Sequence, residues 1–249
     1  MKKTAFLILP SLLLLFSCQN SQEPARTGEA QNEGTKKETM VVEGEKPLPG
    51  TGMSDVKPPS QEARNQSTLT RRALELLQDK KFEEGIDYLN RALANEPQDA
   101  GILFNRGYAY LNLKEYEKAL QDFNSSLKIN PSDSMTIMYS GLTRYYLNDF
   151  NGAIRDYSNA IQIGKGFSQA YHNRGLARGK LGDYNGAIED FNQAIMLNPN
   201  YAEAFYNRGL ANFFKKDTMN ACLDWTQANR MGAPNAQKAI DLYCASWKN

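Results

Sequence analysis

The sequence has few of the residues that enzymes use for acid–base or metal chemistry. It contains one histidine, His172, and three cysteines in 249 residues. No histidine and no second cysteine pair stands at metal-binding spacing from Cys222 and Cys244. A phosphate-binding glycine loop is also lacking. We therefore expect no catalytic residue, no metal and no cofactor, and the alternative of an enzyme built around His172 is testable by mutating that residue.

An excess of charge of one sign is lacking too. The chain has 29 Lys and Arg against 28 Asp and Glu, a formal net charge of +1. Such a balance gives no general attraction to nucleic acid or to anionic lipid, and no basic stripe is interleaved with aromatic residues. We expect neither a nucleic-acid partner nor a small-molecule substrate.

Long hydrophobic runs are absent except at the N-terminus, where Lys2 and Lys3 precede the apolar stretch 5–16. This stretch has the length of a signal peptide core, about 7–15 residues, and is shorter than the ~20 residues that span a bilayer. Its last residues belong to Leu-Phe-Ser-Cys at 15–18, which resembles a bacterial lipobox. The resemblance implies a lipoprotein signal peptide at 1–17 and lipidation of Cys18. The alternatives are an ordinary cleaved signal and an N-terminal membrane anchor.

Residues 18–65 lack the apolar side chains that a folded core needs. Met40-Val41-Val42 is the one apolar cluster in a stretch rich in Gln, Glu, Gly, Pro, Ser and Lys. Burial of so little apolar surface cannot offset the loss of chain entropy, so we predict a disordered tether with a reach of roughly 40 Å. The alternative is that part of this segment folds on a partner.

A fixed period organises the chain from residue 66. The triplet Asn-Arg-Gly stands at 105–107, 173–175 and 207–209, and the first separation is twice the second. The repeating unit is therefore about 34 residues long, and such a fixed period is typical of stacked structural units and not of a single active site. The predicted units are 66–99, 100–133, 134–167, 168–201 and 202–235.

Small and large residues recur at fixed positions within these units. Position 8 is small in every unit: Ala73, Gly107, Gly141, Gly175 and Gly209. Position 24 is large in every unit: Leu89, Phe123, Tyr157, Phe191 and Trp225. Proline at position 32 marks the end of a second helix in three units: Pro97, Pro131 and Pro199. Two helices per unit with this pattern resemble the tetratricopeptide repeat (TPR) family, which implies an all-α fold, an α-solenoid of helix–turn–helix repeats.

A last segment, 236–249, follows the repeats and predicts a capping helix over the open end of the solenoid. Its apolar residues recur at helical spacing between Ala236 and Trp247. Cys244 would lie on this helix and Cys222 on the helix beneath it. Two interpretations remain at this point, a disulfide between them, which we favour, and two buried free thiols.

The arginine of the triplet, at position 7, has a candidate partner sixteen residues later at position 23. The predicted pairs are Arg106–Asp122, Arg174–Asp190 and Arg208–Asp224. Antiparallel helices could join each pair as a bidentate ion pair that is structural and not ligand-binding. Unit three departs from the pattern, since Ser140 stands opposite Asp156, and Asp156 could instead reach forward to Arg174.

The first helix of each TPR unit, helix A, lines the concave surface in this family, and position 6 faces it. The resemblance therefore implies a peptide- or protein-binding groove lined by the following residues: Phe104, Asn105, Tyr108, Met138, Tyr139, His172, Asn173, Tyr206 and Asn207. Aromatic anchors with polar groups around them are typical of protein-binding surfaces. The TPR subgroup that grips a C-terminal carboxylate has lysine and asparagine where Phe104 and Tyr108 stand, so we predict no carboxylate clamp.

These patterns favour a lipid-anchored scaffold of the bacterial cell envelope. We expect it to hold an extended peptide or a helix of another envelope protein in the groove. Gln19, and not aspartate, follows the lipidated cysteine, which favours the outer membrane facing the periplasm. The alternative function is a pilot or assembly chaperone for a secreted or outer-membrane subunit. Self-association, and a groove that is merely solvated, also stay open.

Overall fold

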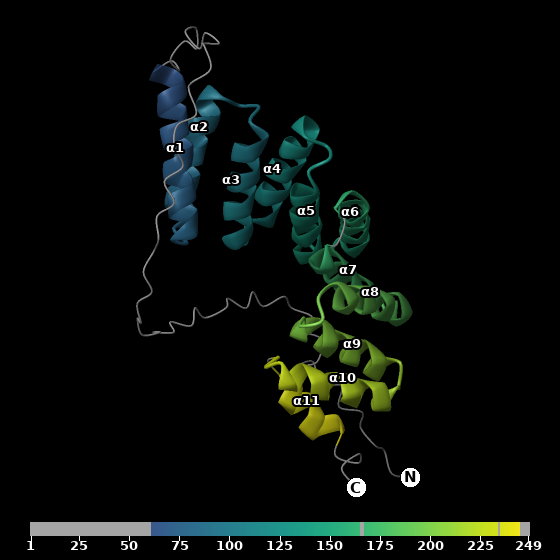
Figure 1. Cartoon of the computed structure of the whole chain (residues 1–249). Coiled ribbons are helices and arrows are strands. Elements are labelled where there is room, and N and C mark those ends of the chain that lie inside the picture. The colour runs from purple at the N-terminus through teal and green to yellow at the C-terminus, as the bar shows by residue number, and fades with distance from the viewer. Residues whose placement is uncertain (1–60, 165–166, 234, 245–249) are drawn as a thin grey trace, which may run out of the picture. The chain divides into compact units, whose positions relative to one another are not determined.

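The computed structural model describes residues 61–164, 167–233 and 235–244, with side chains from residue 68 onward. The predicted signal peptide, the lipidation site Cys18, the tether up to residue 60 and Trp247 lie outside the described residues. The prediction of disorder is wrong for residues 61–65, which belong to the first helix. The described part of the chain is helical throughout and contains no strand (Figure 1).

Within the described ranges, ten helices form five consecutive pairs, and an eleventh follows. The pairs are α1 (Gln61–Gln78) and α2 (Phe82–Asn95), α3 (Ala100–Asn112) and α4 (Tyr116–Ile129), α5 (Ser134–Tyr146) and α6 (Phe150–Ile163), α7 (Ser168–Lys180) and α8 (Tyr184–Leu197), and α9 (Ala202–Phe214) and α10 (Thr218–Arg230). The eleventh, α11, runs from Ala236 to Tyr243. We call the first helix of each pair helix A and the second helix B. The all-α repeat architecture expected from the sequence is confirmed.

Aspartates and left-handed residues set the ends of these helices. The side chains of Asp99, Asp133, Asp149, Asp183 and Asp217 accept a hydrogen bond from a backbone N–H in the first turn of the following helix. The turn from helix A to helix B has a positive φ at position 15 in every unit. The residues are Lys80, Lys114, Asn148, Gly182 and Lys216. Only one of these five is the glycine that such a conformation favours.

Within each pair, the small residue at position 8 lies directly against the large residue at position 24. A Cβ atom added to Gly175 would come within 2.8 Å of the Phe191 ring, and one added to Gly209 within 2.7 Å of Trp225. The rings of Phe191 and Trp225 are fully buried. Glycine therefore permits the close approach of helix A to helix B, which is the structural role that its repetition predicts.

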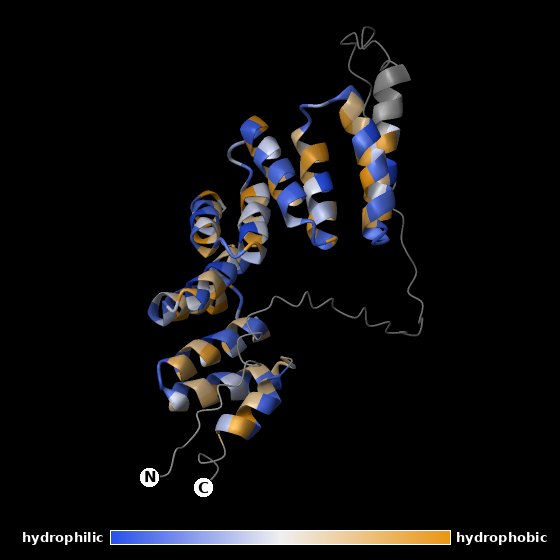
Figure 2. Ribbon diagram, turned by 180° about the vertical axis from the view of Figure 1, so that it is seen from behind, coloured by the Kyte–Doolittle hydropathy of each residue, from blue (hydrophilic) through white to orange (hydrophobic). Residues whose placement is uncertain are grey.

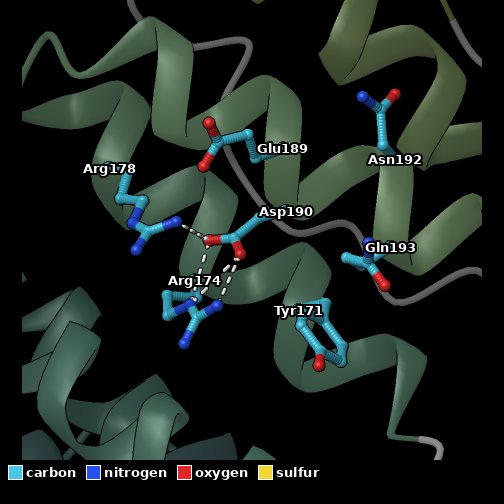
Figure 3. Close-up of a pocket in the computed structure, with 7 residues that line it drawn as sticks. All are labelled: Tyr171, Arg174, Arg178, Glu189, Asp190, Asn192 and Gln193. Atoms are coloured by element: carbon cyan, nitrogen blue, oxygen red, sulfur yellow. Dashed lines mark hydrogen bonds and ion pairs between the residues drawn. The ribbon is translucent and has the colours of Figure 1, made fainter.

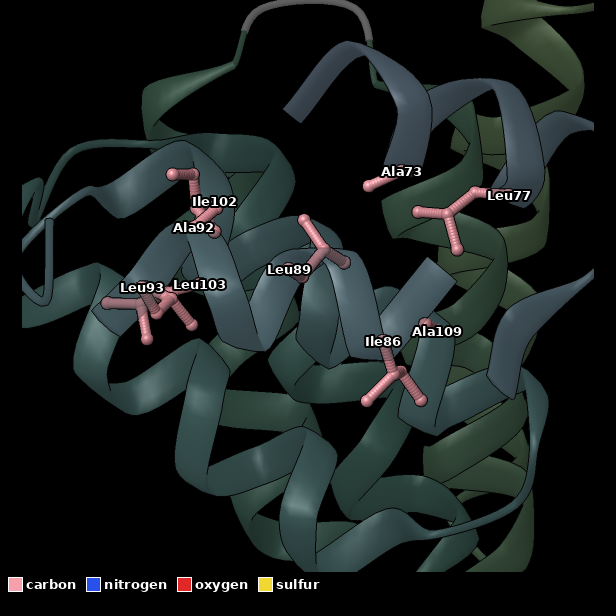
Figure 4. Close-up of a cluster of buried hydrophobic side chains, with 9 residues drawn as sticks. All are labelled: Ala73, Leu77, Ile86, Leu89, Ala92, Leu93, Ile102, Leu103 and Ala109. Carbon is pink, nitrogen blue, oxygen red and sulfur yellow. The ribbon is translucent and has the colours of Figure 1, made fainter. Parts of the chain in front are cut away.

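Successive helices pack against one another in chain order, and the helices A of neighbouring repeats also touch. This contact between helices A places them on the inner side of the array. Each helix has hydrophobic and hydrophilic faces (Figure 2). Figure 4 shows how the first two repeats share one core, in which Leu89 of α2 packs with residues of α1 and α3.

Helix α11 covers the end of the array, as expected of a cap. The Tyr243 ring lies 4.5 Å from that of Phe213 and 5.8 Å from that of Trp225, measured between centroids. The structure joins Cys222 to Cys244 by a disulfide with a Cα–Cα distance of 5.8 Å. The helix ends at Tyr243, earlier than the apolar spacing up to residue 247 suggests.

Candidate protein-binding surface

The open part of the inner side lies on α3 and α5. Phe104, Asn105 and Tyr108 of α3 and Tyr139 of α5 are all partly exposed there. The Tyr139 ring lies 5.6 Å from the ring of Phe104 and 5.6 Å from that of Tyr108, and both contacts are edge-to-face. This geometry is favourable for aromatic pairs and fixes the rings in place. We call these four residues the α3–α5 surface.

The polar groups of the α3–α5 surface are available to a partner. No hydrogen bond joins the Asn105 amide, the Tyr108 hydroxyl or the Tyr139 hydroxyl to any residue that the structure describes. Burial, and to a lesser extent Tyr108, raises the pKa of Tyr139, so its phenol stays neutral. The surface thus offers fixed rings, one amide and two uncharged hydroxyls.

The other five predicted groove residues are buried, which differs from the expectation of one continuous groove. Met138, His172, Asn173, Tyr206 and Asn207 keep only 3–6% of their surface exposed. Helices A of neighbouring repeats pack over these side chains, so they stabilise the contact between repeats. Periodicity assigns a residue to a face of its own helix, but it does not show how closely the next repeat covers that face.

Three side chains on the inner side form a hydrogen-bonded chain that joins α7 to α9. Asn207 Nδ2 lies 3.0 Å from His172 Nε2, and His172 Nδ1 lies 3.3 Å from Asn173 Oδ1. Burial lowers the pKa of His172 to about 4, and the opposing effects of Asn173 and Glu203 are smaller. The imidazole is therefore neutral, and the bonds fit the tautomer in which Nδ1–H donates to Asn173 and Nε2 accepts from Asn207.

Aromatic rings enclose the imidazole of His172. The centroid of its imidazole lies 4.8 Å from that of Tyr201 and 5.6 Å from that of Phe191. Both of its nitrogens are occupied by amides, and the side chain is buried. On the described chain, no serine, cysteine or carboxylate forms a hydrogen bond with the ring.

The predicted arginine–aspartate contacts are present in units two, four and five. Arg106 Nη2 lies 2.7 Å from Asp122 Oδ1, Arg174 Nη2 lies 2.7 Å from Asp190 Oδ1, and Arg208 Nη2 lies 2.6 Å from Asp224 Oδ1. In each pair the arginine Nε also donates to the carboxylate. This bidentate geometry joins helix A to helix B within a repeat.

Two further positions complete these contacts, and neither was predicted from the sequence. Each arginine also donates to a side chain sixteen residues earlier, in helix B of the preceding repeat: Asn90, Ser158 and Asn192 respectively. One turn after the arginine, position 11 adds Arg178 to Asp190 and Asn212 to Asp224. The first of these positions could have been found from the sequence, because it lies sixteen residues before the arginine, just as the aspartate lies sixteen residues after it.

In unit three, Asp156 does not reach forward to Arg174, which was the contact considered from the sequence. Its carboxylate accepts from Ser140 Oγ at 2.7 Å and from Arg144 Nε at 2.9 Å, both in its own unit. Arg174 turns back to Ser158 and pairs with Asp190 instead. The ion-pair partner of Asp156 is therefore Arg144, at position 11 of the same unit.

A shallow pocket lies beside the Asp190 cluster (Figure 3). It is lined by Tyr171, Arg174, Arg178, Glu189, Asp190, Asn192 and Gln193. Both arginines pair with Asp190, and Arg178 also lies 3.9 Å from a carboxylate oxygen of Asp183. The pocket is therefore a product of the ion pairs that hold α7 against α8, and it offers no unpaired cation to an anionic ligand.

The described residues provide neither a metal site nor a membrane-spanning helix. Within the described ranges, no group of three or more His, Cys, Asp or Glu side chains could hold a metal ion. Among the described helices, none combines the length and the apolar character needed to cross a membrane.

Comparison with known families and structures agrees with this architecture. Residues 70–134 match the family profile described as tetratricopeptide repeat, and residues 178–215 match one described as TPR repeat. No curated protein sequence matches the chain.

Solved structures with the same fold are distant in sequence. MamA (41-end) from Desulfovibrio magneticus RS-1 is 22% identical with a TM-score of 0.64, and the match covers 70% of this chain and 96% of that one. YrrB, described as a TPR protein with an unusual peptide-binding site, is 17% identical with a TM-score of 0.61, over 73% of this chain and 98% of that one. The repeat pattern, the helix order and these matches identify the chain as a tetratricopeptide-repeat protein, a fold that supports protein–protein interaction.

Proposed function

We propose that this protein is a lipid-anchored scaffold of the bacterial cell envelope that binds a segment of another protein on its α3–α5 surface. One observation carries the proposal. Phe104, Asn105, Tyr108 and Tyr139 combine fixed, partly exposed rings with polar groups that bond to no described residue. Rigid aromatic side chains with available polar groups are favoured at protein-binding sites because ordering them costs little entropy.

Two further observations support the proposal. The solved structure of YrrB is described as having an unusual peptide-binding site, on the same fold. The lipobox-like stretch ending at Cys18 and the polar stretch after it support attachment to a membrane through a tether. Selective binding is then the whole mechanism, with no chemical step.

An affinity capture from detergent-solubilised membranes tests the binding site. The intact protein is compared with a variant carrying Asn105→Ala and Tyr108→Ala, after circular dichroism shows equal helicity. Tyr171→Ala is the matched control, because Tyr171 is also a partly exposed tyrosine on a helix A but lines the ion-pair pocket. We expect one partner that survives in the control and is lost in the double variant. Equal capture by all three proteins would refute the assignment of the site.

Attachment is tested separately. Metabolic labelling with palmitate is expected to label the protein, and Cys18→Ser is expected to remove the label and release the protein from the membrane fraction. A Cys18→Ser protein that stays membrane-bound would favour an N-terminal membrane anchor over a lipoprotein.

A further inference from the structure

The charges of helices α3 and α5 point away from the proposed binding surface. Each helix contains one charged residue, Arg106 in α3 and Arg144 in α5. Arg106 pairs with Asp122 on α4, and Arg144 pairs with Asp156 on α6. Both arginines therefore face helix B, and the inner side of α3 and α5 has no ionisable group other than neutral phenols.

The uncharged character extends beyond the four residues of the α3–α5 surface. The exposed or partly exposed residues of these two helices also include Gly101, Asn112, Met135, Leu142 and Tyr146. None of them carries a charge. A charged side chain buried against such a surface would lose hydration without gaining an opposite charge, which is costly.

One cation stands at the α1 end of this surface. Arg71 occupies position 6 of unit one, the position that Asn105 occupies in unit two. Its side chain is exposed, and among the described residues it forms no ion pair, whereas its neighbour Arg72 pairs with Glu75. The surface thus runs from a free guanidinium on α1 to uncharged rings on α3 and α5.

We propose that the partner segment is uncharged where it contacts α3 and α5, bears aromatic or aliphatic side chains there, and has an acidic residue at the end that meets Arg71. This inference rests on the proposed function and specifies the partner's chemistry. The apolar part supplies most of the affinity through burial, and the acidic residue fixes the direction of the segment.

Selection of 12-residue peptides from a random displayed library against the purified full chain tests the partner's chemistry. We expect selected peptides to share a central stretch of about four or more residues without Asp, Glu, Lys or Arg, and one Asp or Glu to one side. Their binding should be lost in the Asn105→Ala, Tyr108→Ala variant and kept in the Tyr171→Ala control.

A double-mutant cycle then isolates the role of Arg71. Arg71→Gln is expected to weaken a selected peptide about two- to fivefold, the range of an exposed ion pair, and to have no effect once the peptide's acid is replaced by its amide. Arg72→Gln is the matched control and should change neither affinity.

The outcomes separate the two proposals. Selected peptides that carry charges throughout, yet depend on Asn105 and Tyr108, would overturn the inferred chemistry and leave the binding site in place. Peptides that bind the double variant as well as the intact protein would overturn the site itself, and a failure to enrich any peptide would overturn both.

Two other occupants would also overturn the inference. One is the chain's own segment 36–46, which contains Met40-Val41-Val42, and it would be revealed if a synthetic peptide of that sequence displaced the selected ones. The other is a second copy of the chain, revealed by concentration-dependent self-association that the selected peptides reverse.

Discussion

The four aspartates at position 23 form an internal series in which one residue type occupies one place in four different environments. Asp190 keeps 2% of its side chain exposed, and it accepts hydrogen bonds from both Arg174 and Arg178. Asp156 keeps 20% exposed and accepts from Ser140 and Arg144. Replacement of each aspartate by alanine should therefore cost different amounts of stability at equivalent places in the fold.

The magnitude follows from what each substitution leaves behind. Asp190→Ala removes a carboxylate that two arginines share. Arg174, only 16% exposed, keeps a hydrogen bond to Ser158, and Arg178 keeps a longer contact with Asp183. Removal of one partner from a buried ion pair typically costs 3–5 kcal/mol, and we expect about 3 kcal/mol because Arg178 is more exposed and can regain water. Asp156→Ala leaves Arg144 at 27% exposure and still paired with Asp149, so we expect about 1 kcal/mol.

Urea unfolding followed by circular dichroism measures the series. Equal m-values across the variants would keep the comparison valid, since a changed slope signals altered cooperativity between repeats. Asp87→Ala is the control, because Asp87 is an exposed aspartate on a helix B. The reasoning fails if Asp156→Ala costs as much as Asp190→Ala, or if Asp190→Ala behaves like the control.

Three further predictions concern the C-terminal repeats. Replacement of Cys244 by serine opens the loop closed with Cys222, twenty-two residues away, and should lower the unfolding free energy by about 3 kcal/mol. Added reductant should shift the urea midpoint of the intact protein but not that of the variant. Because burial lowers the pKa of His172 to about 4, its neutral form stabilises the fold above about pH 6.5, and this stability is lost as the pH falls toward 4. The loss should reach about 2 kcal/mol at pH 5, and His172→Phe should unfold with a smaller change between pH 7 and pH 5. Tyr206→Phe should leave thermal stability unchanged or raise it by up to about 1 kcal/mol, because the buried hydroxyl has no hydrogen-bond partner on the described chain, and a clear fall in the melting temperature would contradict this.

The sequence predicted the repeats well because their packing is local to one helix pair. A glycine at position 8 against a large ring at position 24 needs only two antiparallel helices, as Gly175 and Phe191 show. The Arg174–Asp190 contact is of the same kind, since both residues belong to one unit. Interactions within a single repeat therefore leave a pattern that spacing alone can identify.

The turns and the contacts between repeats were harder to predict. Position 15 has a left-handed backbone in every unit, yet lysine occupies it in three of them, as at Lys114. Lysine does not predict a left-handed backbone, because this conformation costs roughly 1–2 kcal/mol for a residue other than glycine. The burial of Asn207 was missed for another reason, because it depends on how far α9 turns against α7, and that angle is set by several contacts at once.

The asparagine of the repeated triplet therefore has two kinds of environment, and the side chains packed around it decide which. Asn105 follows Phe104, which packs edge-to-face on Tyr139 and offers the amide no hydrogen bond, so the amide stays available. Asn173 follows His172, whose two nitrogens meet the amides of both Asn173 and Asn207 and draw them into the contact between repeats. A buried amide with hydrogen-bond partners stabilises a contact, whereas an exposed amide without them is free to bind. The arginine and glycine keep one structural role wherever the triplet occurs, and only the asparagine changes role along the array. The proposed binding surface therefore lies where no neighbouring side chain bonds to the amide at position 6, as at Asn105.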